Sequence, residues 1–517
     1  MIHYYLHIRR LLLPMLVLAC WLLVSCNDFL DVKSNHTASE DEHWNRMEDV
    51  RAALMGVYGL TRAALSENNT HWLCGDLRLG DFTVYDRADL KAIAANDLLG
   101  NHKQLDGIAN WRRFYAAINA AAILIENVPA VPDRDKSYAD EYRRYDIAQA
   151  KAIRAFVYFY MVRMYGDVPL ITQSFDNGSF PSFARSDAQA VLNFAKNELL
   201  TAIPELPYLY GTSTNRYYGN TDSYWRGMLF NKLSAYALLA HIAAWEGNYA
   251  DAEVFAGYVM NNAGRIGAAY ITTSDLTASN NCLFGLPTSA LAGARIIAFP
   301  SSYTYREATQ TGHIEELTLA SPFVQKPYPD IYLAKEKVFS IFDDLADNRF
   351  GVDTATFVYS TAYFNDMNAD YPLFSKIKVI QGGQASDGNY AVFGSSIIFT
   401  RLEEIALLRA EALTALNRPS EALTILNDRR AARGLRALSF RNDFGNSERL
   451  LLQTIFEERR KELMGEGWYW YDCIRRQKLL NDNPMLGKLI VNGGIYWPIA
   501  KDVLSQNDAI EQNKYWK

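Results

Sequence analysis

The chain of 517 residues has only five cysteines, two of them within the first 26 residues. The other three, Cys74, Cys282 and Cys473, are odd in number and far apart. Such thiols neither form a disulfide framework nor show the C-x-x-C spacing of a zinc site. We therefore expect three buried or half-buried thiols, and a fold that is stabilised by the packing of its core.

Motifs of catalysis and of cofactor binding are absent as well. The sequence has no G-x-S-x-G, H-E-x-x-H, P-loop or Rossmann glycine pattern in a convincing context, and its eight histidines lack metal-ligand spacing. We predict a protein without enzymatic activity, cofactor or metal. A glycoside hydrolase or lyase stays open as an alternative, because its two carboxylates are not recognisable among 58 acidic residues.

The chain carries no excess of positive charge. It has 52 Lys and Arg residues against 58 Asp and Glu residues, which gives a net charge of −6. Binding to nucleic acid requires a clustered basic surface. We therefore expect no nucleic acid among the partners of this protein.

Long apolar runs are missing beyond the first 25 residues. Residues 11–25 are uncharged and follow Arg9 and Arg10. As a helix they would reach about 22 Å, less than the roughly 30 Å of a bilayer core, so we predict that residues 1–25 are a secretory signal peptide. The run ends in Leu-Val-Ser-Cys26, which resembles a bacterial lipobox in which Cys26 is acylated. Simple secretion or a free thiol at Cys26 remains the alternative, and the polar residues 26–46 are expected to form a tether.

The region from 47 to 265 is predicted to be mostly helical. Residues 148–166 are apolar on nearly every side, which is typical of a helix inside a helical assembly. Residues 235–261 and 405–431 each consist of a helix, a short turn and a second helix with small residues. This is the pattern of tetratricopeptide repeats, so we predict a mostly α fold with a tetratricopeptide-like scaffold of helical hairpins. An ordinary antiparallel helix pair is the alternative for each segment.

Residues 266–400 differ from the rest of the chain. Gly, Ser, Thr and Tyr accumulate, helical periodicity fades, and short strand-like runs appear. We predict a loop-rich, partly β segment inserted before a helical region over 401–517. Irregular segments on a rigid scaffold often carry binding specificity, and we expect it here.

Four stretches of the sequence form a recognisable set when they are taken in order. They are Arg154 to Leu170, Arg401 to Leu435, Phe456 to Arg476 and Tyr496 to Trp516. Together they resemble the SusD/RagB family of Bacteroidetes outer-membrane lipoproteins. Ala500 and Asp508 stand where the family usually has prolines in its C-terminal stretch.

The resemblance implies a SusD-like helical-repeat region over 47–265 and a SusD/RagB region over 266–517. It further implies a lipid-anchored protein on the outer face of the outer membrane, where Asp28 and Asp31 resemble an export signal. Such proteins capture glycans, or in some members peptides, and pass them to a SusC-like TonB-dependent transporter. A scaffold that only makes protein contacts is a further alternative.

Glycan capture requires flat apolar faces for the C–H surfaces of sugars and polar groups for their hydroxyls. Aromatic residues in segments expected to be loops are therefore candidates, together with the charged residues between two of them. Ordinary loop packing is the alternative for each, and we expect Glu466, Trp468 and Asp472 to brace the fold. The candidates are Trp72, Asp76, Arg78, Asp81, Tyr85, Tyr217, Tyr218, Tyr303 and Tyr305.

Overall fold

Long helices make up most of the protein in the computed structural model, which confirms the mostly α fold predicted from the sequence. The structure describes residues 43–175, 181–285, 290–353, 355–356, 358–383 and 390–517. The predicted signal peptide, Cys26 and most of the predicted tether lie outside the described residues.

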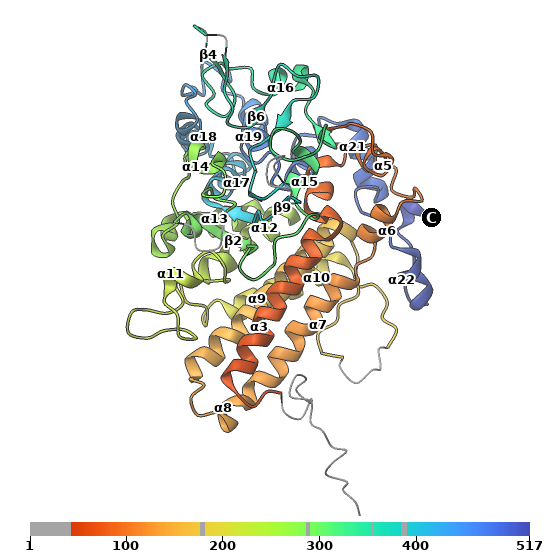
Figure 1. The fold of residues 1–517 in the computed structure, drawn as a ribbon, viewed down its shortest axis with the longest axis vertical. Helices are drawn as coiled ribbons and strands as arrows, with labels where there is room; N and C mark the ends of the chain where they lie inside the picture. The colour runs from red at the N-terminus through yellow and green to blue at the C-terminus, as the bar shows by residue number, and fades with distance from the viewer. Residues whose placement is uncertain (1–42, 176–180, 286–289, 354, 357, 384–389) are drawn as a thin grey trace, which may run out of the picture.

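Four helices from the first half of the chain run side by side in the lower part of Figure 1. α7 packs against α3 and α9, and α10 packs against α9. Residues 103–134, which include α7, are apolar enough by length and composition to cross a membrane, but here α7 is a helix of the packed core. The four helices are α3 (Met47–Ser66), α7 (Arg112–Asn127), α9 (Asp140–Tyr165) and α10 (Ala188–Ala202).

Both predicted helical hairpins are present. The first is α12 (Lys232–Glu246) with α13 (Tyr249–Asn262), and the second is α17 (Leu402–Ala415) with α18 (Pro419–Ala432). α13 packs against α17, so the two hairpins stack although they lie far apart in the sequence. α19 (Glu448–Glu462) and α20 (Tyr469–Leu480) continue the stack.

Within the described residues, ten short helices connect these elements. They are α4 (Thr70–Trp72), α5 (Ala88–Ala94), α6 (Lys103–Ala109), α8 (Val131–Arg134), α11 (Asp222–Trp225), α14 (Thr273–Thr277), α15 (Ile314–Thr318), α16 (Lys335–Ile341), α21 (Pro484–Asn492) and α22 (Lys501–Gln506).

The strands form antiparallel pairs within the described residues. The fully buried pair joins β2 (Arg295–Phe299) to β10 (Ile397–Arg401). Phe156 of α9 contacts Phe299 and Phe399, with ring centroids 5.0 and 4.9 Å apart. This pair therefore fixes the segment over 266–400 to the core of the helical scaffold. The other pairs are β1 (Thr83–Val84) with β3 (Ile331–Tyr332), β4 (Val352–Asp353) with β5 (Val358–Tyr359), β6 (Phe364–Asn365) with β7 (Leu373–Phe374), and β8 (Ile380–Gln381) with β9 (Val392–Phe393).

The three thiols follow the prediction. Cys74 and Cys282 are buried, Cys473 is half-buried, and all three are free. Burial raises the pKa of Cys282 to about 11, which keeps this thiol protonated and unreactive at neutral pH.

Candidate functional site: a cleft beside helix α3

Six of the nine predicted ligand-contacting residues are buried, whereas Tyr303 is half-buried and Tyr85 and Tyr305 are exposed. The prediction that these residues lie in loops is wrong for two of them. Trp72 is the last residue of α4, and Asp76 lies in a π-helix over Leu73–Leu77. The buried six are Trp72, Asp76, Arg78, Asp81, Tyr217 and Tyr218.

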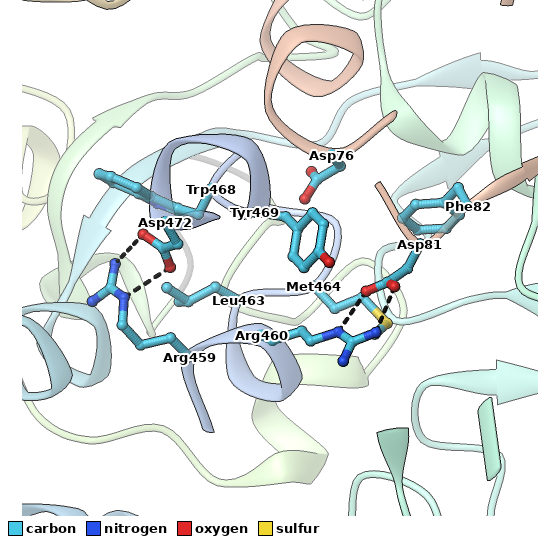
Figure 2. A pocket seen from close by; sticks show the side chains of 10 residues that line it. All are labelled: Asp76, Asp81, Phe82, Arg459, Arg460, Leu463, Met464, Trp468, Tyr469 and Asp472. Atoms are coloured by element: carbon cyan, nitrogen blue, oxygen red, sulfur yellow. Dashed lines mark hydrogen bonds and ion pairs between the residues drawn. The ribbon is translucent and has the colours of Figure 1, made fainter. Parts of the chain in front are cut away.

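The three charged candidates bind other parts of the protein. Asp76 accepts a hydrogen bond from the backbone N–H of Gly467 at 2.6 Å, and burial raises the pKa of Asp76 to about 7. Arg78 donates to the carbonyl of Ile495 at 2.6 Å, while Asp81 pairs with Arg460. Figure 2 shows Asp76 and Asp81 at a crevice of about 10 Å³, barely the space of one water molecule. We therefore assign these residues a structural role in place of the predicted contact with sugar hydroxyls.

Tyr217 and Tyr218 are also tied to the protein interior. Both hydroxyls donate to the carboxylate of Asp146 in α9, which is fully buried. The hydroxyl of Tyr138 donates to the same carboxylate. These tyrosines thus anchor a loop to α9, and their rings are not available to a ligand in this structure.

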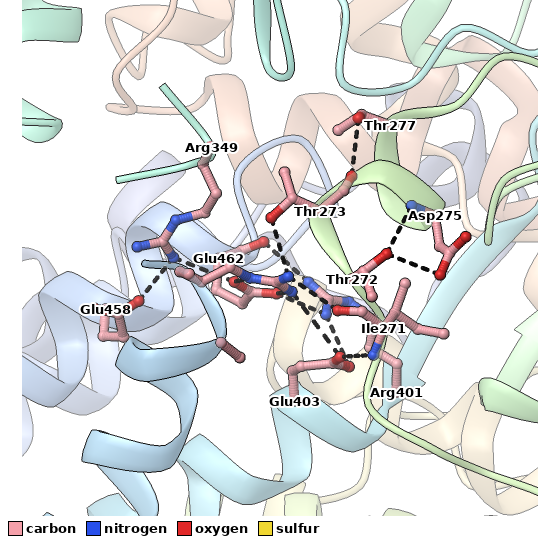
Figure 3. A network of polar contacts seen from close by, with 12 residues as sticks. Ile271, Thr272, Thr273, Asp275, Thr277, Arg349, Arg401, Glu403, Glu458 and Glu462 are labelled. Carbon is pink, nitrogen blue, oxygen red and sulfur yellow. Dashed lines mark hydrogen bonds and ion pairs between the residues drawn. The ribbon is translucent and has the colours of Figure 1, made fainter. Parts of the chain in front are cut away.

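A buried network of carboxylates and guanidinium groups lies between α19 and the segment over 266–400, as Figure 3 shows. Glu462 accepts hydrogen bonds from Arg349, Arg401 and Arg433 at 3.2, 2.8 and 2.6 Å. Burial opposes the charge of Glu462, but the nearby Arg433 and Arg401 hold the pKa of this carboxyl well below its usual range. Its arginine partners and its burial indicate that Glu462 holds the inserted segment on the scaffold.

All three residues expected to brace the fold are buried, namely Glu466, Trp468 and Asp472. Glu466 pairs with Arg401 and with Lys376, and Asp472 pairs with Arg459.

A cleft of about 520 Å³ opens beside α3. The residues of α3 that line the cleft recur three or four positions apart, so they lie on one face of the helix. The cleft therefore follows α3 for roughly three turns. These positions are Arg51, Met55, Tyr58, Gly59 and Arg62.

Two other segments complete the cleft. One is α11 with the turn that follows it, and the other is the end of β2 with the segment that follows it. Together they supply Tyr224, Trp225, Met228, Leu229, Phe299, Pro300, Ser302, Thr304, Tyr305 and Glu307.

Polar groups converge at one end of the cleft. Arg62 donates to the carbonyl of Pro300 and to the carboxylate of Glu307, each at 2.7 Å. Glu307 also accepts a hydrogen bond from the backbone N–H of Ser302 at 3.0 Å. The side chains of Arg62 and Glu307 are 22% and 31% exposed, so parts of both charged groups still face solvent. They can bind ligand hydroxyls from a position that the ion pair already fixes.

Aromatic rings line the other walls. Tyr305 is 69% exposed, and its hydroxyl lies 3.4 Å from that of Tyr224. The guanidinium carbon of Arg51 lies 5.9 Å from the ring centroid of Trp225. A concave site of this volume, with apolar rings and a few fixed polar groups, is typical of small-ligand binding.

Sequence reasoning identified one residue of this cleft, Tyr305. It missed Arg51, Tyr58 and Arg62, because charged residues on an amphipathic helix usually face solvent and aromatic residues usually pack in the core, so neither kind indicates a ligand site. The available signal was their spacing on a single face of α3. Tyr303 does not line the cleft, and its ring packs against Gly394 instead.

Comparisons with known proteins agree with this architecture. A model of the SusD family matches residues 346–488, and a model described as "Starch-binding associating with outer membrane" matches residues 28–243. A crystal structure of a SusD superfamily protein from Bacteroides thetaiotaomicron is 55% identical, with a TM-score of 0.86, over 92% of this chain and 100% of that chain.

Two more distant proteins extend the comparison. SusD-like protein P38 of Formosa agariphila is 25% identical, and the alignment covers 96% of this chain and 97% of that protein. A laminarin-binding SusD-like protein shares the fold, with 20% identity and a TM-score of 0.62 over 91% of this chain and 99% of that one.

Proposed function

The chain belongs to the SusD family, and from this premise we propose that it captures glycans in the cleft beside α3. The observation that carries the proposal is the combination of the exposed ring of Tyr305 with the fixed pair of Arg62 and Glu307. The ring offers an apolar face to sugar C–H groups, and the ion pair offers donors and acceptors to hydroxyls. The family description, which names starch binding, and the laminarin-binding relative support this ligand class.

We further propose that the protein works by equilibrium binding at the outer membrane, without cleaving its ligand. Acylation of Cys26 would anchor it, the residues over 26–46 would act as its tether, and the protein would face the cell exterior. A SusC-like TonB-dependent transporter would then receive the glycan. Confinement to the membrane raises the effective concentration of the protein beside such a partner. Labelling cells with radioactive palmitate tests the anchor, and a Cys26→Ala variant is its control.

Two glycines of α3 provide a matched test of the cleft. Gly59 lines the cleft and Gly56 is exposed outside it, and a Cβ atom at either position would meet no atom within 4 Å. Gly59→Leu should fill the cleft and weaken binding to soluble starch or laminarin at least tenfold, about 1.4 kcal/mol. Gly56→Leu should bind like the unmodified protein, and both changes should leave α3 at least as stable, because leucine favours helix over glycine.

Tyr305→Ala is expected to weaken binding by a similar factor. Affinity electrophoresis and titration calorimetry measure these effects. Equal binding by the Gly59→Leu and Gly56→Leu variants would refute the assignment of the cleft. Release of reducing ends from either polymer would favour the hydrolase or lyase alternative, and binding of peptides without binding of glycans would favour the peptide-binding one.

A further inference from the structure

Arg51 is the one charged residue of the cleft beside α3 that has no partner of opposite charge among the described residues. The other two charged residues that line the cleft, Arg62 and Glu307, pair with each other at 2.7 Å. Glu48 precedes Arg51 by three positions on α3, but in the described chain no ion pair joins the two. One positive charge of the cleft is therefore left uncompensated, in a protein whose net charge is −6.

Two buried aromatic rings support the guanidinium group of Arg51. Its carbon atom lies 5.9 Å from the ring centroids of both Tyr218 and Trp225. The attraction between a cation and an aromatic face holds the group in place without using its N–H donors. The hydroxyl of Tyr218 donates to Asp146 at 2.6 Å, which fixes the first ring. The indole N–H of Trp225 donates to the carbonyl of Tyr217 at 2.9 Å, which fixes the second.

The donors of Arg51 lie near a pair of tyrosine hydroxyls. The hydroxyl of Tyr224 lies 3.4 Å from that of Tyr305, and this hydrogen bond raises the pKa of Tyr224. The positive charge of Arg51 opposes the rise, which indicates that the guanidinium group is close to this hydroxyl. The ring of Tyr305 is 69% exposed, and Arg51 is partly exposed. This part of the cleft thus combines an open ring, a hydroxyl pair and an unpaired cation.

A sugar acid matches this arrangement in shape and in charge. The C–H groups of its ring can pack on the face of Tyr305, and its carboxylate can accept two parallel hydrogen bonds from the planar guanidinium group. The carboxylate can also accept a hydrogen bond from the hydroxyl of Tyr224. A neutral sugar would make only neutral acceptors available to Arg51, and such hydrogen bonds are roughly half as strong.

We propose that the cleft selects acidic glycans, and that Arg51 determines this specificity by binding the carboxylate of a uronic acid. The inference rests on the proposed function of the cleft, to which it adds the charge of the ligand. Neutral glycans use the same rings and the same pair of Arg62 and Glu307, but they bind more weakly. The net charge of −6 repels an anionic polymer as a whole, so a preference for such a polymer requires a local cation.

Laminarin and soluble starch provide matched probes for this proposal. Oxidation of their primary hydroxyls to carboxylates adds negative charge and leaves the glycosidic linkages unchanged. At low salt the unmodified protein should bind each oxidised polymer about tenfold more tightly than its neutral parent, because a hydrogen bond between charged groups is the stronger kind. Raising the salt concentration to about 0.5 M should reduce this preference, since Arg51 is partly exposed and its charge is screened. Titration calorimetry measures both affinities.

Substitutions of Arg51 test whether this residue causes the preference. Arg51→Gln should reduce it to less than about twofold. Arg51→Glu should reverse it, so that the neutral polymer binds more tightly than its oxidised form. Thermal denaturation checks the folding of both variants, which lose no ion pair or hydrogen bond of this side chain within the described residues. Arg441→Gln is the matched control, because it removes an exposed, unpaired arginine of the described chain outside the cleft, and it should keep the full preference.

The outcomes separate this inference from the proposed function. If Gly59→Leu weakens the binding of both forms of a polymer and the unmodified protein binds the two forms equally, the cleft is the glycan site but does not select acids. A preference that survives in Arg51→Gln would also overturn the inference, because the carboxylate would then bind elsewhere. If Gly59→Leu binds both forms like the unmodified protein, the assignment of the cleft fails, and the inference fails with it. An unmodified protein that binds none of the four polymers overturns both proposals.

Discussion

Two groups of tyrosines in this protein use the same side chain in opposite ways. In the buried group, Tyr138, Tyr217 and Tyr218 direct their hydroxyls at the single carboxylate of Asp146. In a surface group, which consists of Tyr85, Tyr328, Tyr332 and Tyr371, the hydroxyls find no partner within the described chain, and two of the rings are open to solvent. The contrast teaches that the role of a tyrosine here depends on what its hydroxyl meets, because ring packing occurs in both groups.

The buried group also supports the cleft. Gln149, one turn after Asp146, donates to the hydroxyl of Tyr217 and accepts a hydrogen bond from Tyr58, each at 3.0 Å. Tyr58 lines the cleft, and the backbone carbonyl of Tyr217 accepts a hydrogen bond from the indole N–H of Trp225 at 2.9 Å. The buried tyrosines therefore position one wall of the site.

The largest difference between the two groups should appear when Asp146 is removed. Asp146→Ala leaves three buried hydroxyls without their acceptor, and each stranded hydroxyl costs about 1–3 kcal/mol. We expect the free energy of unfolding to fall by about 3–5 kcal/mol. Tyr85→Ala should lower it by less than about 1 kcal/mol, because that ring is already exposed.

Chemical denaturation of both variants measures these changes. Comparable losses in the two variants would mean that burial does not distinguish the tyrosine groups. A loss below about 1 kcal/mol for Asp146→Ala would show that other acceptors replace this carboxylate.

The stability of the protein should depend on pH through the carboxyl group of Asp146. Burial raises the pKa of Asp146 from an ordinary 3.8 to about 6, although the hydroxyls of Tyr138 and Tyr217 lower it. The folded state then binds the proton more tightly than the unfolded state, so stability falls as pH rises from about 4 to 6. For this carboxyl the change is about 3 kcal/mol.

The Asp146→Asn variant lacks this proton, so the difference in unfolding free energy between it and the original protein isolates the effect. Other titrating groups, such as Glu462 with its lowered pKa, are common to both proteins and cancel. The original protein should lose stability relative to Asp146→Asn between pH 4 and pH 6. Parallel curves would indicate that Asp146 keeps an ordinary pKa in the folded state.

The fold was largely predictable because its signals are local. The hairpins α12–α13 and α17–α18 are recognisable in the sequence by apolar helices, short turns and small residues. All of these signals lie within about 30 positions of one another. The buried network around Glu462 was not predictable, because Arg349 and Arg401 reach it from distant segments. Sequence periodicity indicates which face of a helix is apolar. It does not indicate which charged residue from a distant segment a side chain will contact.

The candidate site was predictable only in part, for the same reason. Tyr85, Tyr217 and Tyr305 look alike in the sequence, each in a polar, loop-like context. What separates them is Asp146, which lies 71 positions before Tyr217 and, of these three tyrosines, accepts a hydrogen bond only from Tyr217. Asp76 and Asp81 likewise look like loop residues until Gly467 and Arg460 are placed beside them.

The smallest effect comes from removing one hydroxyl from each group. Tyr217→Phe should lower the free energy of unfolding by about 1–2 kcal/mol, because its hydroxyl bonds both Asp146 and Gln149. Tyr328→Phe should change it by less than about 0.5 kcal/mol, because its hydroxyl has no protein partner in the described chain. Thermal denaturation of the two variants provides the comparison. If Tyr328→Phe proved as costly as Tyr217→Phe, the hydroxyl of Tyr328 would have a partner in the folded protein, and the contrast between the two groups would fail.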